Sequence, residues 1–189
     1  SSEGNFILPD DNEDIISFGG TDTVSGIDFS SVTLSSKAYS SSINQKVVSS
    51  ITSFDYENTG TISSSDLLSL SNDIDIYIEN PIVVAFDDAA NDSIYNKYFE
   101  VNSQLFLLTY GTQLYVNEKY DNSLDSRIFY QQLYQSIFDE YDDALQNGID
   151  LSEYIETKDF LNVYINSAVE SALGLSDGTL EDETLDSLI

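Results

Sequence analysis

The chain has 189 residues and a strongly acidic balance, with 34 Asp and Glu residues against 6 Lys and Arg residues and a net charge of -28. It contains no Cys and no His, which excludes a disulfide, a Cys or His catalytic pair and the usual thiolate and imidazole ligands of zinc. The negative charge predicts repulsion from nucleic acid and anionic membranes, and attraction of cations. No apolar run approaches the ~20 residues that span a bilayer.

The first 36 residues predict an extended arm rather than a helix. Two short apolar runs, at 5–8 and 15–18, are followed by proline, glycine or acidic turn residues, as strands often are. Two short strands are not stable alone. We expect them either to lean on the helical part of the chain or, lacking partner strands within the chain, to complete a sheet in a neighbouring domain or subunit.

From residue 42 the apolar residues follow a helical period. Ile43, Val47, Val48 and Ile51 share one face, which predicts a first helix over 42–51. After a polar stretch, Ser63 or Ser64 is expected to cap a short leucine-containing helix.

The middle of the chain predicts a strand followed by a helix. Residues 73–79 alternate isoleucines with polar residues, which is the period of a strand. Asn80 and Pro81 then predict a helix start, with proline at the first helical position.

Long amphipathic helices are expected in the second half of the chain. One begins at Asn91 or Asp92 and ends near Tyr120, the next ends near Asn147, and the last large one ends at Gly174. The fold class is therefore predicted as mainly α, a helix bundle of five or six helices with an N-terminal extended or β arm. We expect the arm at 1–36, the helical bundle domain at 37–175 and an acidic C-terminal tail at 176–189.

The sharpest motif is the stretch 55–66, which reads DYENTGTISSSD. Its oxygen-bearing residues follow the order of an EF-hand calcium loop, with glycine sixth and isoleucine eighth. The predicted Ca²⁺ ligands are Asp55, Glu57, Thr59, Thr61 through its carbonyl, Ser63 and Asp66. Glutamate at the third position and aspartate at the twelfth predict weak affinity, in the ~10⁻⁵–10⁻³ M range. The alternative is a polar connection whose serines cap the next helix.

Other acidic clusters carry less specific signals. A stretch from Asp143 to Asp150 has Leu145 at a ligand position and is interpreted as a helix end. The acidic turn at 10–14 is either a cation site at a domain junction or a solvated turn. Tyrosines at helical spacing are interpreted as core residues first, and as a sugar- or protein-binding surface second.

Three stretches and the long helix over 91–120 carry a family resemblance. They read GGTDTVSG at 19–26, KVVSSITS at 46–53 and LSLSNDIDIYIENP at 68–81. In this order the chain resembles a helical module of very large secreted bacterial proteins, which are adhesin-like, repeat-rich and associated with glycine-rich RTX calcium-binding repeats. The resemblance implies a surface or secreted scaffold without enzymatic activity, in which residues 4–18 are similar to the closing strand of a preceding β-sandwich.

We therefore expect a non-enzymatic structural or adhesive module of a secreted or cell-surface bacterial protein, stabilised by calcium at the EF-hand-like loop. The alternative is a self-assembling subunit of an extracellular filament, whose arm adds a strand to a neighbouring sheet. Expected partners are neighbouring domains, identical subunits, and surface glycans or proteins, with no nucleic acid and no membrane insertion. An enzyme with paired carboxylates has no specific support, because 34 acidic residues allow any pair to be nominated.

Overall fold

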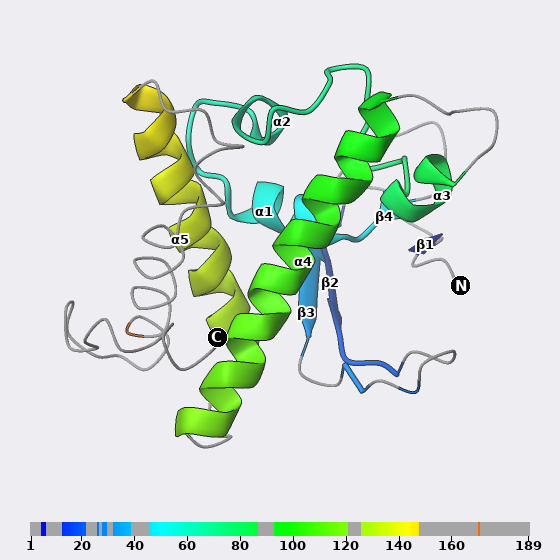
Figure 1. Cartoon of the computed structure of the whole chain (residues 1–189). Coiled ribbons are helices and arrows are strands. Elements are labelled where there is room, and N and C mark those ends of the chain that lie inside the picture. Colours follow the sequence, from blue (N-terminus) through cyan, green and yellow to red (C-terminus); the bar gives the residue numbers. More distant parts are fainter. Residues whose placement is uncertain are drawn as a thin grey trace. The chain divides into compact units, whose positions relative to one another are not determined.

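The computed structural model describes residues 5–6, 13–21, 26, 28–29, 32–38, 46–86, 93–120, 126–147 and 170. These residues are mainly helical, which confirms a mainly α class (Figure 1). The bundle of five or six helices stays a prediction. In chain order the elements are β1 (Asn5–Phe6), β2 (Ile15–Phe18), β3 (Thr33–Ser36), β4 (Lys46–Val47), α1 (Ser50–Glu57), α2 (Ser64–Leu67), α3 (Pro81–Ala85), α4 (Ser93–Tyr120) and α5 (Ser126–Gln146). None of these helices combines the length and hydropathy that a membrane span requires.

The chain forms two compact units, Ser1–Leu107 and Leu108–Ile189, and α4 continues from one into the other. The expected boundaries at 36 and 175 stay predictions. The predicted ends of α4 and α5 are confirmed to within a residue. The predicted cap at Asn91 or Asp92, the acidic tail and the last large helix lie outside the described residues, except that Glu170 is helical.

The strands of the N-terminal arm find partners within the chain, so the expectation that they lack them is wrong. β2, predicted with its bounds, pairs antiparallel with β3, with Ile15 opposite Ser36 and Phe18 opposite Thr33 (Figure 1). β1 pairs antiparallel with β4. Gly19 and Gly20 follow β2 with φ of 76° and 137°, in a region that side chains with a Cβ rarely adopt, which accounts for the paired glycines there.

The predicted helix over 42–51 is wrong at its described end. Residues 46 and 47 form β4, and α1 begins only at Ser50. The cause is a reciprocal capping interaction. Ser49 Oγ accepts from the backbone N–H of Thr52 at 3.2 Å, and Thr52 Oγ1 accepts from the backbone N–H of Ser49 at 2.8 Å. These bonds satisfy donors that a helix start leaves open, and they set where the helix begins.

β3 and α1 are joined through hydroxyl groups. The backbone N–H of Ser35 donates to Ser53 Oγ at 2.8 Å, and Thr52 Oγ1 donates to the carbonyl of Ser35 at 2.8 Å. Ser53 Oγ also donates to the carbonyl of Ser49 at 2.7 Å. Thr52 and Ser53 are 0% and 1% exposed. Side chains of a helix therefore occupy the edge of β3 that a further strand would otherwise use.

The short helices follow local signals. Ser63 caps α2 as predicted, since its hydroxyl accepts from the backbone N–H of Asp66 at 3.1 Å. α3 begins at Pro81 as predicted, with Asn80 Oδ1 accepting from the N–H groups of Ile82 and Val83 at 2.9 and 3.2 Å.

The predicted strand at 73–79 is wrong, because these residues form turns. Asp75 Oδ1 accepts from the N–H of Tyr77 at 3.1 Å, and the Asp75 carbonyl accepts from the N–H groups of Ile78 and Glu79 at 3.1 and 2.9 Å. Such local bonds from aspartate compete with the ladder of a sheet. The alternation still marks buried residues, since Ile74 and Ile76 are each 6% exposed. Their burial is achieved by turns and not by a strand.

Each unit buries a tyrosine in its core, as the interpretation of the tyrosines expected. In the first unit Tyr98 is 0% exposed, and its hydroxyl donates to the carbonyl of Glu79 at 2.9 Å. In the second, Tyr130 is 2% exposed and donates to Gln113 Oε1 at 2.8 Å. Burial raises the pKa of both phenols far above the usual value, and Glu79 adds to the rise at Tyr98.

Candidate functional site

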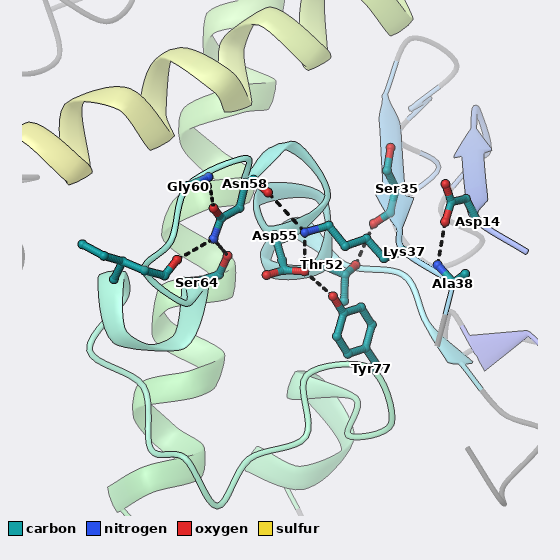
Figure 2. Close-up of polar contacts among 11 residues, drawn as sticks. Asp14, Ser35, Lys37, Ala38, Thr52, Asp55, Asn58, Gly60, Ser64 and Tyr77 are labelled. Carbon is teal, nitrogen blue, oxygen red and sulfur yellow. Dashed lines mark hydrogen bonds and ion pairs between the residues drawn. The ribbon is translucent and has the colours of Figure 1, made fainter. Parts of the chain in front are cut away.

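The first predicted calcium ligand, Asp55, lies inside α1 rather than at the start of a loop. Its Oδ2 is 3.3 Å from Lys37 Nζ, and it accepts a hydrogen bond from the hydroxyl of Tyr77 (Figure 2). The Asp55 side chain is 15% exposed, and that of Lys37 is 38% exposed. One carboxylate therefore ties together the segment after β3, helix α1 and the turns before α3. We call these three residues the Asp55 cluster.

Lys37 has a second role at the end of α1. Its Nζ donates to the backbone carbonyl of Asn58, the C-cap residue of that helix, at 3.3 Å. A positive charge is favourable there because the last carbonyls of a helix have no partner within it and carry partial negative charge. The ammonium thus neutralises Asp55 and complements the helix end at once. Next to it, Asp14 Oδ1 accepts from the N–H of Ala38 at 2.6 Å, which holds the chain beyond β3 against the segment before β2 (Figure 2).

The loop after α1 is closed by the side-chain amide of Asn58. Asn58 Oδ1 accepts from the N–H of Gly60 at 2.9 Å, and Nδ2 donates to the carbonyl of Ile62 and to Ser64 Oγ, both at 2.9 Å (Figure 2). In a calcium loop the cation would draw the loop inward. Here an amide makes the cross-links.

The remaining predicted ligands are spread around this loop. Ser63 and Asp66 are brought together, with Ser63 Oγ donating to Asp66 Oδ2 at 2.7 Å. Thr59 and Thr61 are exposed, and Glu57 is half-buried at the last position of α1. Across the described residues no three acidic side chains form a group that could hold a metal ion. Calcium binding at 55–66 stays a prediction.

Sequence reasoning missed the partners of Asp55. Lys37 is one of 6 basic residues, and any carboxylate near it is a candidate partner. The sequence does not mark Asp55 as that partner, because the separation of the two residues matches no helix or strand period. Tyr77 lies 22 residues from Asp55, in the stretch whose alternation predicts a strand. Asn58 carried a usable signal, because Asn often bonds the backbone two residues on.

A second feature of the first unit is an apolar pocket of about 600 Å³. It lies between β4, the start of α1, α3 and residues 93–107 of α4, and none of the described residues that line it is charged. Phe29 and Phe106 form one wall, with ring centroids 5.7 Å apart in an edge-to-face arrangement. Phe99 forms another wall and packs against Phe86 at 5.5 Å.

Comparison with known proteins finds no matching family model, and neither a curated protein sequence nor a solved structure shows significant similarity to the chain.

Proposed function

We propose that the chain is a non-enzymatic structural module of a secreted or cell-surface bacterial protein, with a helical bundle over 37–175 preceded by the N-terminal arm. The charge of -28 and the resemblance described above support this role. The observation that carries it is the Asp55 cluster. Asp55, the first residue of the predicted calcium loop, contacts Lys37 and Tyr77 and joins their two segments. Contacts of this kind serve a structural role.

The charge explains why such a cluster matters. Self-repulsion destabilises a compact chain with a large net charge, and dissolved salt relieves it. Lys37 places a fixed positive charge where Asp55 and the carbonyl end of α1 meet, at 3.3 Å from each. For calcium to use Asp55, that carboxylate would have to leave Lys37 and Tyr77.

The proposal is tested by thermal melting with millimolar calcium against magnesium at equal ionic strength. Because Ser63 and Asp66 are exposed and already adjacent, a calcium-stabilised loop should melt higher in calcium, and Asp66→Ala should lose the gain. Asp73→Ala, which removes an exposed carboxylate outside 55–66, is the control. Equal melting in the two salts would remove calcium from the proposal. Release of reducing sugar from a polysaccharide panel by the purified chain would overturn the non-enzymatic role.

The alternative function, self-assembly by strand addition, is favoured by the outer edge of β2. The N–H of Gly19 points toward β3, donating to the Val32 carbonyl at 3.0 Å. Because backbone groups alternate along an antiparallel strand, the N–H groups of Ile16 and Phe18 face away from β3. Ser35, opposite Ile16, directs its own backbone groups to α1, which agrees with this alternation. Among the described residues no second strand pairs with β2, and Phe18 is 77% exposed.

This alternation gives a selective test of assembly. Ile16→Pro removes an outward N–H and spares the bonds between β2 and β3, whereas Ser17→Pro removes an inward one. If the chain assembles through β2, sedimentation velocity in high salt should show oligomers for the wild type and monomers for Ile16→Pro, with the helical circular dichroism unchanged. A wild type that stays monomeric at high concentration, in salt and calcium, would refute assembly. Oligomers that persist in Ile16→Pro would place the contact elsewhere.

A further inference from the structure

The apolar pocket of the first unit is unusual for this chain because the described residues that line it carry no charge. Asp, Glu, Lys and Arg make up 21% of the sequence. A surface hollow in such a chain would ordinarily include several of them. Its volume of about 600 Å³ lies within the roughly 300–1,000 Å³ of small-molecule sites.

The pocket has a buried floor and an exposed apolar mouth. Val47 and Val48 are 1% and 8% exposed, so the floor belongs to the core. At the mouth Ile82, Val83 and Leu107 are 56%, 44% and 66% exposed. These apolar side chains are exposed to water at the rim of an apolar hollow. Covering them with a further apolar surface removes them from water, which is favourable.

The polar groups at the pocket exclude an anion as the occupant. α1 begins there, but its first N–H groups are taken. Asn102 Oδ1 accepts from Ser50 and Ile51 at 3.1 and 3.4 Å, and Ser49 Oγ accepts from Thr52. Among the described residues no cationic side chain lines the pocket, and the net charge of the chain repels negative ligands. In the part of the chain that the structure describes, no carboxylate lines it to pair with a cationic ligand either.

On α4, two hydrogen-bonding groups among the lining residues have no partner in the described part of the chain. They are the Nδ2 amide of Asn102, whose Oδ1 is used at α1, and the hydroxyl of Ser103. Both lie on α4 beside Phe106. Polar groups of this kind, placed at the edge of an apolar pocket, orient a ligand and select one that carries an acceptor.

We propose that this pocket binds an uncharged, largely apolar small molecule that carries a hydrogen-bond acceptor, such as a long-chain alcohol, ester or ketone. The apolar body would lie between Phe99 and Phe106, and the acceptor would face Asn102 and Ser103. This goes beyond the structural role and does not depend on it.

The test uses the neutral dye Nile red and two competitors of equal chain length, 1-decanol and decanoate. Dye fluorescence should rise to saturation with the chain. Decanol should displace the dye, and decanoate should need at least about tenfold higher concentration because it alone is charged. Ser103→Phe fills the pocket from α4 and should abolish saturable binding. Gln104→Phe adds the same bulk at the next position, which does not line the pocket, and should bind as the wild type does.

Circular dichroism and melting establish that each variant is folded, and Val83→Phe at the mouth replaces Ser103→Phe if the latter unfolds. Equal dye binding by the blocking and control variants would overturn the proposal, as would a wild type without saturable binding. Equal displacement by decanol and decanoate would refute selection for an uncharged ligand.

Discussion

Removing the Asp55 carboxylate should lower the stability of the fold more than the loss of one half-buried side chain near the end of a short helix usually does. The bond from the Tyr77 hydroxyl has a charged acceptor and is worth about 1.5–3 kcal/mol. The Lys37 side chain is 38% exposed, so that ion pair is screened and contributes only about 0.5–1 kcal/mol. Asp55→Ala is therefore expected to lower the free energy of unfolding by about 2–4 kcal/mol.

Urea unfolding followed by circular dichroism measures this loss as a shift in the midpoint. Double-mutant cycles separate the two contacts. Asp55→Ala with Tyr77→Phe should give a coupling of about 1.5–3 kcal/mol, and Asp55→Ala with Lys37→Met about 0.5–1 kcal/mol. Added salt should reduce the second coupling far more than the first.

The order of the two couplings is the decisive result. A Lys37 coupling larger than the Tyr77 coupling, or a loss of under about 1 kcal/mol on Asp55→Ala, would refute the assignment of the phenol as the main partner. Asp73→Ala, at an exposed carboxylate in a turn, serves as the control and should change stability by less than about 0.5 kcal/mol.

Three further predictions follow from single side chains. Asn58→Ala removes three bonds and should cost about 1–3 kcal/mol and speed limited proteolysis at 58–64, whereas Asn72→Ala in an exposed turn should do neither. Asn102→Ala removes the acceptor at the start of α1 and should cost about 0.5–2 kcal/mol in urea unfolding; a loss as large in Asn102→Asp, which keeps the acceptor, would contradict this reason. Burial raises the pKa of Tyr98 above its usual 10.0, so the unfolded chain releases that proton first as pH rises. The stability due to the buried phenol is complete below about pH 10 and falls by about 1.4 kcal/mol per pH unit above it. Tyr98→Phe should remove one proton from that slope, and an unchanged slope in urea unfolding would disprove it.

The parts of the fold that were predictable are those set by neighbours in sequence. The bounds of β2, the cap at Ser63 and the start of α3 at Asn80 and Pro81 each follow from a few adjacent residues. The start of α1 was missed although its signal is also local. The apolar spacing of Val47 and Ile51 fits a helix, but the capping pair at Ser49 decides where the helix begins.

The site was less predictable because its contacts join distant segments. The order of residues in 55–66 matches calcium ligands, but a ligand order says nothing about which atoms a carboxylate meets after folding. Asp55 meets Tyr77, 22 residues away. The pocket draws on Phe29, Val47, Ile82 and Phe106, which share no period that could mark them as neighbours.

The hydroxyl groups between β3 and α1 have a consequence for how this chain can change over generations. Small polar residues are usually replaced freely, and apolar contacts accept substitutes of similar volume. A directional bond from Thr52 to the carbonyl of Ser35, at 2.8 Å, accepts neither kind of replacement. We therefore expect Thr52 and Ser53 to tolerate as few substitutions as the aromatic core residues do. In a random mutant library, most replacements at these two positions should be depleted among folded members.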